Sequence, residues 1–160
     1  MTVSADAPTA MTARMDLHAL TPKQYRAMLA LNQSAHDFDP VIRELVKIRA
    51  SQMNGCAYCI DMHALDARAH GETEQRLYAL NAWRETPFFT SRERAALALA
   101  EAMTDLAHGH VPDDVYAEVA RHFQAEELGL LIWTVVVINA WNRAAVTTRM
   151  LPGTYQPRGQ

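Results

Sequence analysis

Apolar residues recur every three or four positions along most of this chain, and recognisable helix ends interrupt the recurrence. Val41, Leu45 and Ile48, for example, share one face of a segment that follows Asp39-Pro40. Threonine or aspartate before proline, threonine with glutamate three residues later, and glycine after an apolar run are typical of helix ends. These signals predict seven helices, over about residues 21–34, 40–54, 56–71, 73–83, 90–107, 112–123 and 126–149.

No segment alternates apolar and polar residues for long, and the β-branched run 135–138 has helical flanks. A chain of 160 residues with only 6 glycines and 7 prolines suits one helical domain. We therefore expect an all-α, single-domain helical bundle of about seven helices over residues 16–151. Residues 1–15 are expected to be a flexible N-terminal tail, and residues 152–160 a C-terminal tail.

Charge and hydropathy narrow the choice of partner and compartment. The net charge of −3 at pH 7 gives no electrostatic reason to expect nucleic acid or an anionic membrane. The first 15 residues lack the basic start and apolar stretch of a secretory signal. The longest apolar run, from Leu128 to Ile138, is shorter than the roughly 20 residues that span a bilayer, so we expect a buried helix or a subunit interface. These features predict a cytoplasmic protein.

The chain has only two cysteines, Cys56 and Cys59, and they stand three residues apart at the start of a predicted helix. Thiols at this spacing can close a disulfide and be reduced again without refolding the domain. His63 follows Cys59 by four residues, one turn further along the same face. If the helices before and after Gly55 pack antiparallel, the carboxylate of Glu44 can face the thiols. Together these four side chains predict a thiol redox centre.

The four residues also provide the proton transfers that thiol chemistry needs. A thiolate attacks a hydroperoxide and becomes a sulfenic acid, the second cysteine condenses with it to a disulfide, and an external dithiol restores the pair. The helix N-terminus favours a thiolate at Cys56, whereas Cys59 lies within reach of His63, so the residues alone leave the attacking cysteine open. Glu44 would act as a base or orient His63.

Other interpretations of these residues were weighed. The cysteines could be two small buried side chains, and Glu44 could be a surface carboxylate paired with Lys47 or Arg43. A zinc site could use both cysteines, His63 and Glu44, but structural zinc sites usually bring a second pair from a distant loop, and none exists. Haem attachment requires histidine directly after the second cysteine, where Ile60 stands. We therefore predict no metal and no bound cofactor.

The segment ELVKIRASQMNGCAYCIDMH, with the pattern E-x(11)-C-x-x-C-x-x-x-H, resembles the core of alkylhydroperoxidase D-like proteins. These proteins belong to the carboxymuconolactone decarboxylase-like superfamily, and the later INAWNR is similar to their helical core as well. The resemblance covers roughly residues 20–150. It implies an all-helical fold that assembles into trimers or hexamers, and peroxidase activity with electrons from a dithiol such as a lipoyl group or a lipoylated protein.

By this resemblance Cys59 is the peroxidatic thiol, Cys56 the resolving thiol, and Glu44 and His63 form the proton relay. Tyr58 stands where the best-studied type has a histidine, which implies a simpler relay. Decarboxylases of the superfamily typically lack the cysteine pair. The predicted function is reduction of organic hydroperoxides or hydrogen peroxide. The alternatives are a redox-sensing or disulfide-exchange module, and a non-redox, decarboxylase-like enzyme.

The polar residues after the longest apolar run allow two interpretations. The first is core packing together with a cation at the helix end. The second places some of them beside the thiol pocket or at a subunit contact. The residues concerned are Asn139, Trp141, Asn142 and Arg143.

Overall fold

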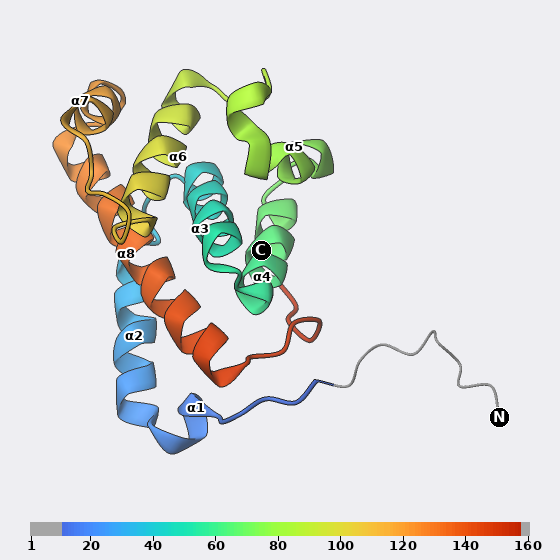
Figure 1. Ribbon diagram of the computed structural model, residues 1–160. Helices are drawn as coiled ribbons and strands as arrows, with labels where there is room; N and C mark the ends of the chain where they lie inside the picture. The colour runs from blue at the N-terminus through green and yellow to red at the C-terminus, as the bar shows by residue number, and fades with distance from the viewer. Residues whose placement is uncertain (1–10, 158–160) are drawn as a thin grey trace.

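The computed structural model describes residues 11–157, and this part of the chain contains helices and no strand. The predicted all-α class is therefore confirmed, whereas residues 1–10 of the predicted N-terminal tail lie outside the described range. The elements are α1 (Leu17–Leu20), α2 (Pro22–Ser34), α3 (Pro40–Asn54), α4 (Ala57–Ala69), α5 (Glu74–Ala79), the 3-10 helix η1 (Leu80–Glu85), α6 (Ser91–Thr104), α7 (Asp113–His122) and α8 (Ala125–Thr148) (Figure 1).

Helix α3 lies in the middle of the bundle, with α4, α6 and α8 packed around it (Figure 1). It begins as predicted, because the Asp39 side chain accepts hydrogen bonds from the N–H groups of Val41 and Ile42. Four apolar side chains of α3 belong to the main core: Ile42, Leu45, Val46 and Ile48. Residues of η1, α6 and α8 belong to the same core. This burial holds α3 in a fixed position relative to its neighbours.

The turn from α3 to α4 sets the position of the cysteine pair. Gly55 has a left-handed conformation, with φ 65° and ψ 33°, which glycine adopts at no steric cost. Cys56 follows as the N-cap of α4, and its sulfur accepts a hydrogen bond of 3.3 Å from the N–H of Cys59. The chain therefore reverses at Gly55, and α4 runs back along α3 (Figure 1).

The predicted helix over residues 73–83 is wrong in its extent. The chain forms α5 and then the 3-10 helix η1, and Ala82 within η1 has non-helical backbone angles. Leu80 and Trp83 are both buried, and a 3-10 turn brings residues three apart onto one side. Burial of these two side chains therefore outweighs the continuation of an α-helix. Helix α6 begins at the predicted Thr90–Glu93 capping box but ends at Thr104, three residues early, and the short α1 was not predicted.

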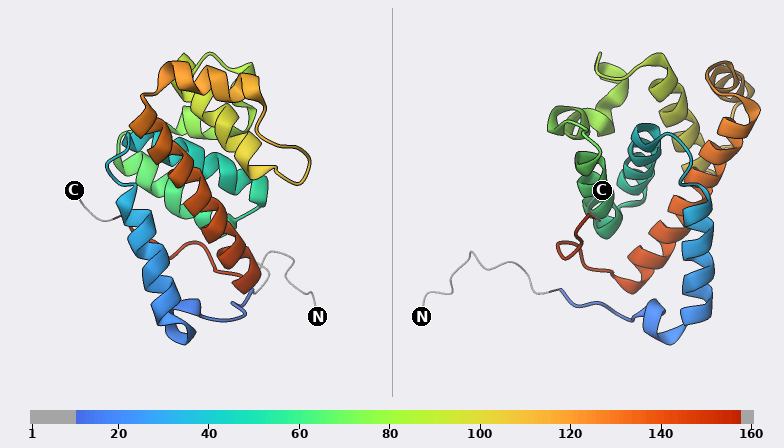
Figure 2. Two further views of the ribbon diagram at one scale, coloured as in Figure 1. Left: turned by 90° about the vertical axis from the view of Figure 1, so that its left-hand side faces the viewer. Right: turned by 180° about the vertical axis from the view of Figure 1, so that it is seen from behind.

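Helix α8 crosses the bundle and packs on α3 and α6 (Figure 2). Of the described helices it alone is long and apolar enough to cross a membrane by length and composition, a test that buried helices of soluble proteins also pass. Its buried face contributes Leu128, Leu131 and Val135 to the core. The opposite face leaves Trp133 and Val136 exposed, at 52% and 41%.

Both segments predicted to be tails contact the bundle where the structure describes them. The N–H of Arg14 donates to the carbonyl of Thr148 over 2.8 Å. Beyond α8, the N–H of Gly153 donates to Asp61 on α4 over 2.8 Å, and the hydroxyl of Tyr155 donates to Asp66 over 2.7 Å. The chain between Met150 and Tyr155 thus lies against α4 (Figure 2).

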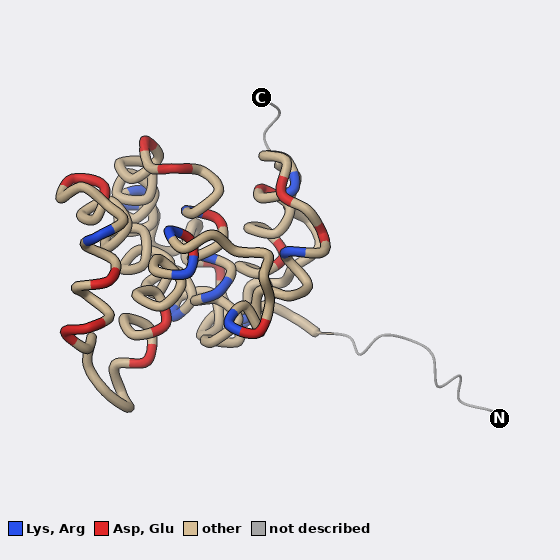
Figure 3. Tube along the Cα trace, turned by 90° about the horizontal axis from the view of Figure 1, so that it is seen from above, with Lys and Arg blue, Asp and Glu red and all other residues tan. Residues whose placement is uncertain are grey.

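Acidic and basic residues are spread over the described helices, although α2 contains only basic ones and α7 mainly acidic ones (Figure 3). This distribution agrees with the small net charge of −3.

Candidate active site

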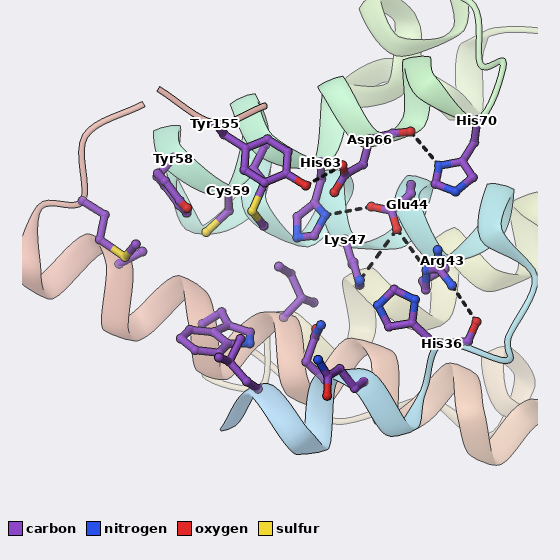
Figure 4. A pocket seen from close by; sticks show the side chains of 18 of the residues that line it. His36, Arg43, Glu44, Lys47, Tyr58, Cys59, His63, Asp66, His70 and Tyr155 are labelled. Atoms are coloured by element: carbon purple, nitrogen blue, oxygen red, sulfur yellow. Dashed lines mark hydrogen bonds and ion pairs between the residues drawn. The ribbon is translucent and has the colours of Figure 1, made fainter. Parts of the chain in front are cut away.

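A cavity of about 380 Å³ lies between α2, α3, α4, α8 and the segment that follows α8. Cys59 and His63 from α4 line it together with Glu44 from α3, so three of the four predicted site residues meet in one space (Figure 4). Four aromatic residues contribute to its wall: Tyr25, Tyr58, Trp141 and Tyr155.

Cys56 and Cys59 form a disulfide, with their Cα atoms 5.4 Å apart. Both are buried, at 1% and 2% exposure, and they pack with Ala50, Ile138 and Ala145. Cys59 lines the cavity, whereas Cys56 is not among its lining residues. Of the two sulfurs, that of Cys59 therefore has the better access to a molecule in the cavity.

Glu44 and His63 form a buried pair across the interface of α3 and α4. The Nδ1 atom of His63 lies 2.7 Å from Oε2 of Glu44, and the two residues are only 5% and 3% exposed. The interpretation of Glu44 as a surface carboxylate is therefore wrong. Figure 4 shows His63 between Cys59 and Glu44, so the imidazole can connect the thiol with the carboxylate.

Two cations contact the other oxygen of the same carboxylate. The Nε atom of Arg43 donates to Glu44 Oε1 over 3.0 Å, and Nζ of Lys47 lies 3.7 Å from that oxygen. Burial works to raise the pKa of the Glu44 carboxyl. The hydrogen bond with His63 and the charges of Lys47 and Arg43 outweigh burial and hold that pKa well below its usual range.

Burial also lowers the pKa of His63, although the contact with Glu44 opposes this effect. At neutral pH the pair therefore consists of an ionised Glu44 and a neutral imidazole. An ionised carboxylate only accepts hydrogen bonds, so Nδ1 of His63 carries the proton and donates it to Glu44. The Nε2 atom is then the basic nitrogen, available to a group in the cavity.

Asp66 and Tyr155 belong to the site but were not predicted from the sequence. Asp66 follows His63 by three residues on the same face of α4, which is the one signal that could have identified it. Its carboxylate accepts the hydrogen bond from the Tyr155 hydroxyl. Tyr155 follows Pro152-Gly153 in a segment without periodicity, so no sequence pattern places it at the cavity.

The carboxylates of Glu44 and Asp66 and the imidazole of His63 offer ligand atoms within 4.8 Å of one another, which is close enough to hold a metal ion. Both oxygens of Glu44 are already engaged, one by His63 and the other by Arg43 and Lys47. Two neighbouring cations oppose a further positive charge at this carboxylate. The donor set therefore fits a proton-transfer pair better than a metal site.

The asparagines of α8 form a polar cluster behind the cavity. The Nδ2 atom of Asn54 donates to Oδ1 of Asn139 and of Asn142, each over 2.9 Å. Asn142 in turn donates to Ser51 over 3.0 Å, and Asn139 donates to Thr104 over 3.0 Å. This cluster joins the end of α3 to α8 beside the turn that carries Cys56. Core packing is thus the better interpretation of both asparagines.

The two remaining polar positions of α8 have different roles. Trp141 lines the cavity, where its ring contacts that of Tyr25 edge to face, with the centroids 5.2 Å apart. Arg143 donates to the carbonyl of Asn139 over 3.0 Å, within its own helix. Tyr58 also lines the cavity, and burial is the main reason that the pKa of its hydroxyl is raised.

A helical domain with a C-x-x-C disulfide beside a buried carboxylate and imidazole is typical of alkylhydroperoxidase D-like proteins. The chain belongs to the carboxymuconolactone decarboxylase family, whose model matches residues 22–102. The uncharacterized protein YdfG of Bacillus subtilis (strain 168) is 41% identical over 138 residues, which cover 85% of this chain and 94% of YdfG.

Solved structures support the same assignment. A protein of unknown function from Agrobacterium tumefaciens, provisionally described as an antioxidant defence protein AhpD, superposes with a TM-score of 0.87. It is 34% identical, and the match covers 90% of this chain and all of that protein. The debrominase Bmp8, solved in complex with 2,3,4-tribromopyrrole, has a TM-score of 0.76 over 85% of this chain and 74% of its own. At 19% identity, this likeness establishes the common fold only.

Proposed function

We propose that the protein is a thiol-dependent peroxidase that reduces organic hydroperoxides or hydrogen peroxide through a Cys56/Cys59 disulfide cycle. The observation that carries the proposal is the access of Cys59 to the cavity that also contains the Glu44–His63 pair. An external dithiol, such as a lipoyl group free or on a protein, supplies the electrons. The proposal places the protein in the cytoplasm, where such dithiols are kept reduced.

The first half of the cycle uses Cys59 and His63. In the reduced protein, Nε2 of His63 accepts the Cys59 proton, and the thiolate attacks the distal oxygen of the hydroperoxide. The O–O bond breaks, the bond electrons leave on the alkoxide, and His63 returns the proton to give an alcohol. Cys59 is then a sulfenic acid. Glu44 orients the imidazole and balances its positive charge while it holds the proton.

The second half restores the thiols. The Cys56 sulfur attacks the Cys59 sulfur, the disulfide forms, and hydroxide leaves as water with the Cys56 proton. The external dithiol exchanges twice with this disulfide, so its two thiols become a disulfide and both cysteines recover their hydrogens. In total, one hydroperoxide and one dithiol give one alcohol, one water and one external disulfide.

Access supports the assignment of Cys59 as the attacking thiol, because Cys56 lies behind it at the N-cap of α4. The proposal also includes assembly into homo-oligomers, as trimers or hexamers. The exposed apolar side chains of Trp133 and Val136 on α8 support it, since patches of this kind mark contacts between proteins.

Steady-state peroxide consumption with dihydrolipoamide tests the proposal. We expect turnover by the wild-type protein and none by Cys59→Ser, which lacks the nucleophile. Without the dithiol, Cys56→Ser should consume about one equivalent of peroxide and then stop at the Cys59 sulfenic acid, because no second cysteine is present to resolve it. Wild-type turnover by Cys59→Ser would refute the assignment. Oxidation of the thiols by one equivalent of peroxide without turnover would instead favour the redox-sensing module. An enzymatic activity that survives alkylation of the thiols would favour the non-redox, decarboxylase-like enzyme.

A further inference from the structure

Lys47 is a buried cation in the cavity wall, and its ammonium takes no direct part in the bond changes of the proposed peroxide cycle. It is only 4% exposed, and Figure 4 shows its side chain extending from α3 toward the cavity beside Glu44. Its one direct contact among the described residues is the ion pair with Glu44, at 3.7 Å. That distance exceeds the length of a hydrogen bond, so the three N–H donors of the ammonium lack close acceptors.

The neighbouring cation, Arg43, already has close acceptors. Its guanidinium donates to Glu44 over 3.0 Å and to the carbonyl of His36 over 2.7 Å. Arg43 therefore already compensates the charge of Glu44. Asp66, the other carboxylate of the wall, accepts a hydrogen bond from Tyr155 and forms no ion pair with a described residue. The Nζ atom of Lys47 forms no hydrogen bond within 3.5 Å with a described residue, and Lys47 lines the cavity, so its ammonium is accessible to a ligand.

The rest of the cavity is suited to an apolar body. Ile138 and Met150 line it and pack with the disulfide, and Tyr25 and Trp141 also belong to its lining. One water molecule occupies about 30 Å³ in the liquid, so hydrogen peroxide needs about twice that volume. A cavity of about 380 Å³ is several times larger, and it is in the size range that holds small organic ligands.

We propose that this cavity binds an organic acid, with the carboxylate at Nζ of Lys47 and the apolar body between Trp141 and Cys59. The ammonium supplies charge-assisted hydrogen bonds, which are stronger than those between neutral groups. His63 lies between Lys47 and Cys59 in Figure 4, so the acid and the reactive group belong to different parts of the ligand. If the protein is the proposed peroxidase, its substrate is then the hydroperoxide of an organic acid. This part of the inference rests on the proposed function.

Binding tests the inference without turnover. We would measure the affinity of the disulfide form for 2-naphthoate and for its uncharged analogue 2-naphthamide by calorimetry. Wild type should bind the acid at least about tenfold more tightly than the amide. Lys47→Met should lose that preference. Lys23→Met is the matched control and should keep it, because Lys23 is the only other lysine of the chain and is exposed.

A second measurement covers the case in which Lys47→Met does not fold. Biosynthetic labelling with [13C]lysine gives signals from two lysines only, and 2-naphthoate should shift that of Lys47 and leave that of Lys23 unchanged. Equal affinity for the acid and the amide, no binding of the acid, or an unmoved Lys47 signal would each overturn the inference.

Kinetics separate this inference from the proposed function. Linoleic acid hydroperoxide should have a kcat/KM at least about tenfold above that of its methyl ester, and Lys47→Met should bring this ratio close to one, whatever its effect on turnover of both substrates. Turnover without this preference would leave the peroxidase standing and overturn the inference. If the protein binds 2-naphthoate through Lys47 but turns over no hydroperoxide, the inferred acid site stands and the proposed peroxidase function is refuted.

Discussion

At the scale of single residues, the site depends on two groups whose ionisation is set by their surroundings. Glu44 stays charged because His63, Lys47 and Arg43 stabilise its carboxylate more than burial destabilises it. His63 stays neutral because burial lowers its pKa. Neutral imidazole is the form that accepts a thiol proton, so this environment prepares His63 for the proposed reaction.

The same shift predicts how stability varies with pH. The pKa of His63 is lower in the folded protein, so below about pH 6.5 the unfolded chain binds a proton that the folded protein does not. The stabilisation that comes from keeping His63 neutral is fully present above this pH and is lost as the pH falls below it. Between about pH 7.5 and 5.5, the free energy of unfolding should fall by up to about 1.4 kcal/mol more in wild type than in His63→Gln. Urea denaturation at the two pH values measures this difference, and equal pH dependence in both proteins would contradict it.

Some site residues could be found from the sequence and others could not. Cys56, Cys59 and His63 follow one another within two helical turns, so their spacing alone places them close together. Glu44 required one assumption, the antiparallel packing of α3 and α4. Lys47 lies one turn beyond Glu44, but only the rotation of α3 in the bundle determines that its ammonium faces the cavity.

At the scale of helices, the amide cluster fixes the end of α3 against α8. Asn142 both accepts from Asn54 and donates to Ser51, and it is 1% exposed. Removal of its side chain deletes two of the hydrogen bonds that join α3 to α8, one from Asn54 and one to Ser51. That loss is costly inside a protein, because water cannot replace the missing hydrogen bonds.

We therefore predict that Asn142→Ala lowers the free energy of unfolding by about 3 kcal/mol. Asn81→Ala is the matched control, since Asn81 is exposed on η1 and its loss should change stability by less than about 0.5 kcal/mol. Chemical denaturation of the two variants tests the claim. Similar losses in both, or no loss in Asn142→Ala, would show that the cluster does not hold the two helices together.

The N-terminal ends of α3 and α6 were among the most predictable parts of the fold. Asp39 and the Thr90–Glu93 capping box act through hydrogen bonds within one turn, so local sequence is sufficient to recognise them. The break between α5 and η1 was missed because it follows from the burial of Leu80 and Trp83 against distant helices. Local propensity contains no information about such contacts.

At the scale of the whole molecule, the cavity exists only because distant segments converge. Tyr25, Glu44, Cys59, Trp141 and Tyr155 come from five different parts of the chain. The fold class and the family followed from the sequence, since helix periodicity and the cysteine motif are local features. The shape of the cavity and the position of Lys47 in its wall depend on packing, and therefore required the structure.

The central claim is that Cys56 and Cys59 cycle between dithiol and disulfide when a hydroperoxide enters the cavity. The most direct test adds one equivalent of cumene hydroperoxide to the fully reduced protein and counts thiols by mass spectrometry. The account predicts loss of both thiols, a peptide linked through Cys56 and Cys59, and full recovery with dihydrolipoamide. Two thiols that remain free in the folded protein after this treatment would contradict it.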